Sequence, residues 1–168
     1  MVLFELEPHA DERGSVTEVF RRSWLPMDRE ILQANLSLSR PGVLRGLHFH
    51  REQSDYWCLL RGAAFVGLYD LRTRSPSEGV KAGVRLSSET ASRGVYIPPG
   101  VAHGFYAETD LELVYFVDAY YSGSDEFGVA WDDPRIGIDW PTQEPILSER
   151  DRSNPRLDEL TSIPAFAS

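Results

Sequence analysis

The chain has 168 residues, of which 42% are hydrophobic and 26% charged, and this composition predicts one globular domain over residues 1–168. A net charge of −9 argues against a nucleic-acid partner, because phosphate backbones are bound by clustered lysines and arginines. No apolar run has the length of a membrane span and no signal-peptide pattern opens the sequence, so we expect no membrane association. The single cysteine, Cys58, excludes an intrachain disulfide and suits a cytoplasmic protein.

Short strand patterns follow one another from the N-terminus. We expect strands over residues 2–6, 15–20 and 31–39, and in the third the side chains alternate between polar and apolar. Gln33 and Asn35 therefore share one face of that strand. Amides directed into the interior of a sheet predict a barrel with a polar cavity that holds a ligand.

The stretch over residues 41–62 concentrates reactive side chains. Its two apolar segments predict two strands joined by a polar loop, and the polar positions are Arg45, His48, His50 and Asp55. Imidazoles, a guanidinium and a carboxylate held together on a rigid β framework are typical of a catalytic or metal site.

The second half of the chain continues the strand pattern. Strands are expected over residues 63–72, 80–86, 93–97 and 111–121. Pro98-Pro99-Gly100 predicts a turn just before His103, and a loop-rich tail with one short helix follows residue 122. Many short strands separated by glycine and proline turns predict an all-β sandwich or barrel of the jelly-roll or cupin kind.

Seven segments of the sequence together resemble a known family. They are DERGSVTE (11–18), QANLSLSRPGVLRGLH (33–48), RGAAFVGLYDLRTRSPSEG (61–79), IPPGVAHGF (97–105), YFVDAYYSGSDEFG (115–128), WDDPRIGIDWP (131–141) and LSERD (147–151). In this order and at this spacing, the chain resembles the dTDP-4-dehydrorhamnose 3,5-epimerases, which are nucleotide-sugar epimerases of the cupin superfamily. The resemblance covers nearly the whole chain. It implies an all-β cupin double-stranded β-helix, or jelly-roll barrel, with short peripheral helices and assembly as a homodimer.

The resemblance also implies a substrate and a reaction. The substrate is a nucleoside diphosphate joined to a 4-keto-6-deoxyhexose, of the dTDP-4-keto-6-deoxyglucose type, and it is epimerised at carbon 3 and/or carbon 5. A base removes the proton beside the ketone, an enolate forms, and an acid returns a proton from the opposite face. The family pattern assigns His48 as the base, Asp151 as the carboxylate that orients it and Tyr115 as the acid. No cofactor is expected for this reaction.

Substrate contacts are implied for a larger set of residues: Arg13, Glu18, Gln33, Asn35, Arg45, His103, Tyr121, Glu126 and Arg150. Tyr121 matches the aromatic residue that stacks on the nucleotide base. Arg150 stands where the family commonly has a lysine.

The sequence departs from the family pattern in its central stretch. Asp55 replaces the active-site lysine that is expected to stabilise negative charge near the ketone, and His50 replaces a common glutamine. An ionised aspartate would instead raise the energy of an enolate. The replacement therefore favours an epimerase that acts at one carbon, or one with an altered sugar substrate.

The same replacements support a second hypothesis. His48, His50, Asp55 and His103 follow the pattern of metal-binding cupins and suit one divalent metal ion, which would make the chain a metal-dependent isomerase or oxygenase. The two hypotheses compete, because a His48 that binds a metal through one nitrogen and Asp151 through the other has no lone pair left for base catalysis. A cupin that binds a sugar nucleotide without catalysis is the third alternative.

Overall fold

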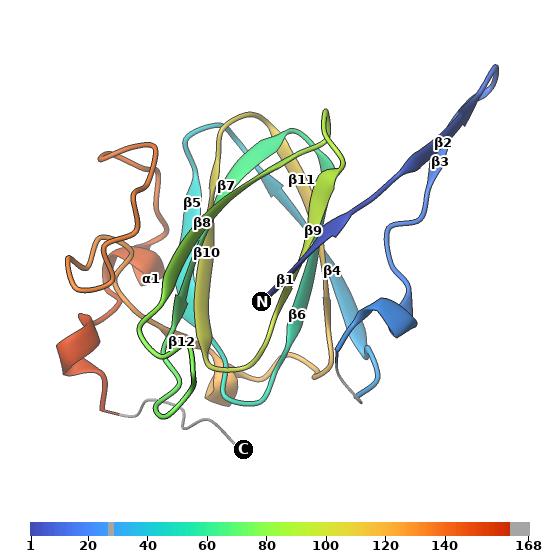
Figure 1. Ribbon diagram of the computed structural model, residues 1–168. Coiled ribbons are helices and arrows are strands. Elements are labelled where there is room, and N and C mark those ends of the chain that lie inside the picture. The colour runs from blue at the N-terminus through green and yellow to red at the C-terminus, as the bar shows by residue number, and fades with distance from the viewer. Residues whose placement is uncertain (27–28, 162–168) are drawn as a thin grey trace.

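The computed structural model describes residues 1–26 and 29–161, and strands dominate it (Figure 1). The strands are β1 (Val2–Glu5), β2 (Pro8–Asp11), β3 (Gly14–Thr17), β4 (Gln33–Ser39), β5 (Leu44–Phe49), β6 (Asp55–Arg61), β7 (Ala63–Asp70), β8 (Lys81–Ser87), β9 (Ser92–Ile97), β10 (Val101–Ala107), β11 (Leu111–Val117) and β12 (Phe127–Gly128). The helical segments of the described residues are short 3₁₀ turns at Arg22–Trp24, Gly123–Asp125 and Leu157–Glu159, and the α-helix α1 (Glu149–Arg152). None of them is long and apolar enough to cross a membrane.

Two antiparallel sheets face each other and form the barrel (Figure 1). The first has the strand order β1-β9-β6-β11-β4, and the second has the order β12-β5-β10-β7-β8. Strands that are distant in sequence are therefore neighbours within each sheet, as in a jelly roll. This arrangement confirms the predicted all-β cupin barrel with short peripheral helices.

A hydrophobic core fills part of the space between the sheets. It is made of alternate inward-facing side chains of both sheets, including Leu59, Val66, Leu86 and Leu113, each at most 2% exposed. Burial of such a side chain contributes roughly 1.5–3 kcal/mol relative to leaving it in water. The rest of the interior is polar, and it contains the cavity described below.

The outer faces of the two sheets are covered by opposite ends of the chain. Leu6 and Leu25 of the N-terminal segment pack with Tyr56 and Cys58 on the first sheet. The segment from about residue 129 to residue 160 packs on the second sheet, where it contacts Leu44, Leu47 and Phe49 among others. The C-terminal segment is thereby held beside β5, the strand that carries His48.

Strand β11 is shorter than its sequence pattern predicts. The apolar alternation indicated a strand over residues 111–121, but β11 ends at Val117. The next residue is the buried Asp118, whose carboxylate accepts a 2.8 Å hydrogen bond from the backbone N–H of Ser54. The chain beyond the strand is thus tied to the loop before β6, a contact that the alternation does not reveal. Similarly, the strand expected over residues 15–20 ends at Thr17.

Two glycines allow β5 and β10 to approach closely. Gly46 has a φ of +127°, and a Cβ atom there would lie 2.7 Å from the Cα of Gly104. A Cβ atom on Gly104 would lie 2.7 Å from the carbonyl oxygen of Arg45. Only glycine fits at both places. The close approach fixes the relative position of His48 and His103, which are cross-strand partners just beyond it.

One hairpin and one strand face are not covered by the rest of the chain. The β2–β3 hairpin projects away from the barrel (Figure 1), and its residues are almost all exposed. Strand β4 lies at the edge of the first sheet and turns Leu36 and Leu38 outward, with exposed fractions of 58% and 63%. Gln33, Asn35 and Ser37 of the same strand turn inward, as the alternation predicted.

Candidate active site

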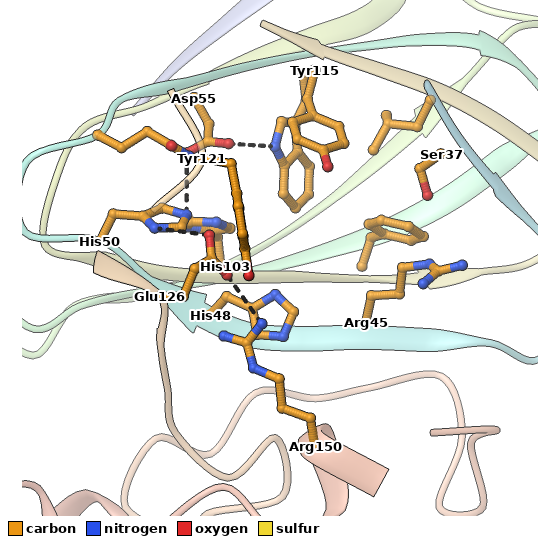
Figure 2. Close-up of a pocket in the computed structure, with 14 residues that line it drawn as sticks. Ser37, Arg45, His48, His50, Asp55, His103, Tyr115, Tyr121, Glu126 and Arg150 are labelled. Atoms are coloured by element: carbon orange, nitrogen blue, oxygen red, sulfur yellow. Dashed lines mark hydrogen bonds and ion pairs between the residues drawn. The ribbon is translucent and has the colours of Figure 1, made fainter. Parts of the chain in front are cut away.

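A polar cavity of about 300 Å³ opens between the two sheets (Figure 2). It is lined by Ser37, Arg45, His48, His50, Gln53, Asp55, Trp57, His103, Phe105, Leu113, Tyr115, Tyr121, Glu126 and Arg150. These residues come from both sheets, from the loop after β5 and from α1. The cavity therefore brings together most of the residues that the sequence assigned to a site.

His48 and Asp151 form a tightly hydrogen-bonded pair. His48 Nε2 lies 2.6 Å from the Asp151 carboxylate, although the two residues are 103 positions apart in the sequence. Asp151 is held in place by the helix α1, where its backbone N–H donates to the hydroxyl of the N-cap residue Ser148. An ionised carboxylate only accepts hydrogen bonds, so Nε2 carries the proton and donates it in the hydrogen bond, and the lone pair is on Nδ1.

The pKa of Asp151 is lowered by this arrangement. Burial alone raises it, but the hydrogen bond from His48, the charge of His48 and the hydrogen bond with Ser148 outweigh burial. Asp151 is therefore ionised at neutral pH and keeps His48 oriented through the N–H on Nε2.

Tyr115 faces His48 from the other sheet. Figure 2 shows the two side chains on opposite walls of the cavity, Tyr115 from β11 and His48 from β5. Burial raises the pKa of Tyr115, and the charges of Asp55 and Glu126 raise it further. The phenol therefore keeps its proton and can donate it.

His50, Asp55 and His103 converge at the inner wall of the cavity. All three are buried, with exposed fractions of 5%, 3% and 4%, and one ligating atom of each lies within 4.8 Å of the others. His50 Nε2 lies 3.7 Å from the Asp55 carboxylate. The Nδ1 atoms of the two histidines point elsewhere: that of His50 lies 2.7 Å from the carbonyl of Asp125, and that of His103 lies 2.9 Å from the carbonyl of Val101.

The pKa values of this cluster are shifted mainly by burial. Burial raises the pKa of Asp55 to about 6, against the opposing effects of His50 and of hydrogen bonds from Gln53 and Trp57. Burial also lowers the pKa of His103, and the neighbouring His50 lowers it further. Both shifts favour the uncharged forms of the side chains.

The predicted set of four metal ligands is not assembled. Among the described residues, the group that could hold a metal ion contains His50, Asp55 and His103 but not His48. His48 is not a member of this group, whose ligating atoms all lie within 4.8 Å of one another. The structure therefore pairs His48 with Asp151 and leaves the other three predicted metal ligands as a separate group.

Several predicted substrate-binding residues lie at the cavity mouth. Arg150 extends from α1 and its guanidinium lies 3.0 Å from the Glu126 carboxylate, and both line the cavity. Tyr121 also lines it and is 71% exposed, so one ring face is open to a ligand. Arg45 lines it too, and donates to the Ser39 hydroxyl. Gln33 and Asn35, which are hydrogen-bonded to each other, line a smaller adjoining cavity of about 140 Å³.

Arg13 and Glu18 lie outside the cavity. Arg13 is in the turn of the projecting hairpin, where it pairs with Asp11. Glu18 follows that hairpin and pairs with Arg21 at 2.7 Å. Within one chain, therefore, the structure does not bring these two residues to the other predicted site residues.

Some residues that line the cavity were not identified from the sequence. Gln53 donates a 3.3 Å hydrogen bond to Asp55 and lines both cavities. Trp57 donates to Asp55 at 3.4 Å, and its ring makes an edge contact with His103 at 5.2 Å between centroids. The sequence could have identified Trp57, because it stands two positions after Asp55 in β6 and therefore lies on the same face of the strand. Gln53 lies in a loop, where no periodicity applies.

Comparison with known proteins identifies close relatives. The family model described as dTDP-4-dehydrorhamnose 3,5-epimerase matches residues 1–159. The dTDP-4-dehydrorhamnose 3,5-epimerase of Methanothermobacter thermautotrophicus is 41% identical over 161 residues, which cover 90% of this chain and 86% of that protein. Both matches span nearly the whole chain.

Solved structures give the same result. A Legionella pneumophila dTDP-6-deoxy-D-glucose-3,5-epimerase in complex with dTDP-4-keto-L-rhamnose superposes with a TM-score of 0.91 at 33% identity, covering 99% of this chain and 93% of the other. A 3'-monoepimerase of Streptomyces bikiniensis in complex with dTDP-quinovose superposes with a TM-score of 0.88 at 33% identity, covering 97% and 88%. The relatives thus include enzymes that act at two carbons and one that acts at a single carbon.

Proposed function

This chain belongs to the dTDP-4-dehydrorhamnose 3,5-epimerase family, and we propose that it epimerises a nucleoside-diphosphate-linked 4-keto-6-deoxyhexose at carbon 3 and/or carbon 5. The observation that carries the proposal is the His48–Asp151 pair, which faces Tyr115 across the cavity. The names of the relatives and the dTDP-sugars bound in their structures support the substrate class.

His48 acts as the base in this proposal. A carbon–hydrogen bond beside a ketone is a weak acid, so its proton must be removed by a group held in contact with it. With Nε2–H donating to Asp151, the lone pair on Nδ1 can take the proton. The ionised Asp151 then stabilises the imidazolium that forms.

Tyr115 returns a proton to the opposite face of the sugar ring. Inversion at a carbon requires that the proton leaves on one side and returns on the other. The base and the acid stand on opposite sheets of the barrel, so a planar enolate held between them meets both. The raised pKa of Tyr115 keeps the phenol protonated until it donates.

The remaining polar residues of the cavity hold the substrate. Arg45 and Arg150 offer guanidinium groups at the cavity wall, and guanidinium groups suit bidentate binding of phosphate oxygens. The exposed ring of Tyr121 offers a stacking surface for the nucleotide base. Gln33 and Asn35 add amide groups beside it.

We also propose that the protein is a homodimer in the cytoplasm. The outward-facing Leu36 and Leu38 on an edge strand form an apolar surface that a second copy can cover. In such a dimer the projecting hairpin of each copy would lie against the other copy. Arg13 and Glu18 of one copy could then contact the substrate in the cavity of the other. The reduced, buried Cys58 suits a reducing compartment.

Proton exchange in deuterated water tests the proposed reaction. The protein is incubated with dTDP-4-keto-6-deoxyglucose, and NMR follows the loss of the proton signals at carbon 3 and carbon 5. We expect both the exchange and the appearance of an epimer, at carbon 3 alone if the protein is a one-carbon epimerase. The matched variants are His48→Asn and Tyr115→Phe, each of which removes one proton-transfer group at nearly constant volume. Undiminished exchange in both variants, or binding of the nucleotide sugar without any exchange, would contradict the proposal.

The dimer has a test of its own. Light scattering on the eluted protein should give twice the chain mass, and the change of Leu36 and Leu38 to glutamate should give a monomer. Mixed dimers of an Arg13→Ala chain with a His48→Asn chain should recover activity, because one of the two sites then has both groups intact. A monomeric wild type that is fully active would rule the arrangement out.

A further inference from the structure

Three groups at the inner wall of the cavity direct lone pairs toward one another. The Nδ1 atoms of His50 and His103 each face a backbone carbonyl, which only accepts hydrogen bonds, so both Nδ1 atoms carry the proton. The Nε2 atoms are then unprotonated. Both histidines therefore present a lone pair, and the third member of the group, Asp55, presents carboxylate oxygens.

A buried cluster that contains only hydrogen-bond acceptors is stabilised by a bound positive charge. Buried lone pairs within 4.8 Å of one another repel, and the hydrogen bonds to Asp55 from Gln53 and Trp57 come from outside the cluster. Two neutral imidazoles and one carboxylate are ligands of divalent transition metals.

We propose that His50, Asp55 and His103 bind one divalent transition-metal ion. Donors around a tetrahedral ion of about 2.1 Å bond length stand about 3.4 Å apart. The 3.7 Å between His50 Nε2 and the Asp55 carboxylate is close to this separation. The contacts of the second ring nitrogens with the carbonyls of Asp125 and Val101 fix the orientation of both imidazoles, as in established metal sites.

The three ligands leave coordination positions open toward the cavity. All three residues line it, together with His48 and Tyr115, so an oxygen of a bound molecule can complete the coordination. If the proposed function holds, the ion lies beside the substrate's ketone and stabilises the enolate oxygen. This role rests on the proposed function, but the binding of the ion does not. The ion would also neutralise Asp55, whose charge otherwise disfavours an enolate at this wall.

His48 stays outside the metal site. It is hydrogen-bonded to Asp151 and is not among the three residues whose ligating atoms lie within 4.8 Å of one another, so the base and the ion use different imidazoles. The cross-strand pairing of His48 with His103 places the base beside one of the three ligands. Base catalysis and metal binding therefore do not compete in this arrangement.

Direct titration tests the metal site without any turnover measurement. The chelator-treated protein is titrated with Co²⁺, whose visible absorption reports nitrogen and oxygen ligands, and with Zn²⁺ while the thermal midpoint is followed. We expect one ion per chain and a midpoint that rises with ion concentration. His50→Gln and Asp55→Asn should each weaken binding by about 100-fold or more, since each removes a ligand. His48→Asn, which changes an imidazole in the same cavity, should bind the ion as the wild type does.

Two outcomes would overturn the site. One is the absence of saturable binding by the folded wild type, and the other is equal loss of binding in His48→Asn and His50→Gln. Circular dichroism establishes that each variant is folded, and if one variant does not fold, the other ligand variant decides. A protein that binds the ion but never exchanges protons would leave the metal site standing and reject the proposed function. A protein that exchanges protons but binds no ion would support the proposed function and reject the metal site.

Discussion

Two imidazole–carboxylate groups lie next to each other in one cavity and differ in how the ring nitrogens are bonded. In the pair of His48 and Asp151, the ring nitrogen and the carboxylate are 2.6 Å apart and hydrogen-bonded. In the group of His50 and Asp55, the corresponding distance is 3.7 Å, and the ring proton is directed to a backbone carbonyl on the other side. The members of the first group are hydrogen-bonded to each other, whereas the members of the second face each other only with hydrogen-bond acceptors.

The difference shows that the group accepting the hydrogen bond from the protonated ring nitrogen determines which way the unprotonated nitrogen of a histidine faces. Nothing in the residue types distinguishes the two groups. When the carboxylate accepts the hydrogen bond from the N–H, the other ring nitrogen is free to act as a base. When a backbone carbonyl accepts it, the nitrogen beside the carboxylate carries a lone pair that a metal ion can bind.

The largest effect is expected from the base itself. His48→Asn should lower kcat/KM by about 10²–10⁴-fold, since it removes the group that abstracts the proton. The measurement is the steady-state rate of epimer formation. Each variant is compared with the wild type after all three have been treated with a chelator, so that loss of the ion is common to them. His50→Gln, which changes the neighbouring imidazole without touching the base, should then lose much less than His48→Asn, and an equal loss in the two variants would mean that the comparison between the groups is wrong.

A smaller effect is expected from the carboxylate behind the base. Asp151→Asn keeps the shape of the side chain but loses the charge that orients and stabilises His48. We expect kcat to fall by about 10²-fold or more while KM changes little, because the lost interaction strengthens only as the imidazolium forms. A loss confined to KM would assign Asp151 to substrate binding instead.

The cap of α1 should matter less again. Ser148→Ala removes the hydroxyl that accepts from the backbone N–H of Asp151. We expect the free energy of unfolding to fall by about 1 kcal/mol, as for other N-cap losses. Urea denaturation measures this change. The rate should fall only a few-fold, since the hydrogen bond between His48 and Asp151 remains to hold the carboxylate.

The smallest effect concerns acid stability. The pKa of Asp151 is lower in the folded protein than its ordinary value of about 3.9. Its ionised form therefore stabilises the fold above that value, and the contribution is lost as the pH falls through the folded pKa. As the pH falls below about 4, the free energy of unfolding should decrease more in the wild type than in Asp151→Asn. Parallel pH profiles for the two proteins would show that the pair adds no stability.

The sequence predicted the barrel and the two centres but not their separation. Alternation in β4 correctly placed Gln33 and Asn35 on the inner face. The family resemblance brought His48 and Asp151 together, and the structure joins them at 2.6 Å. Spacing alone assigned His48 to the metal ligands as well. Only the three-dimensional arrangement shows that His48 lies outside the group of His50, Asp55 and His103, and no sequence pattern encodes which ring nitrogen faces which partner.

Other features lay outside the reach of local patterns. The chain just after β11 is tied by a hydrogen bond between Asp118 and the backbone of Ser54, which is distant in the sequence. The positions of Arg13 and Glu18 depend on the direction of a hairpin relative to the barrel. The extent of the domain over residues 1–168, and the role of each site residue, stay predictions.

The position of Asp151 has a consequence for how the protein matures during synthesis. The ribosome delivers β5 with His48 long before it delivers α1, because 103 positions separate the two members of the pair. The same late segment supplies the apolar coat that covers Leu44 and Leu47 on the outside of the second sheet. A nascent chain therefore joins His48 to Asp151 at the same stage at which it covers Leu44 and Leu47. If His48 has the proposed role, a chain terminated before residue 129 lacks both the catalytic pair and the apolar cover of the second sheet.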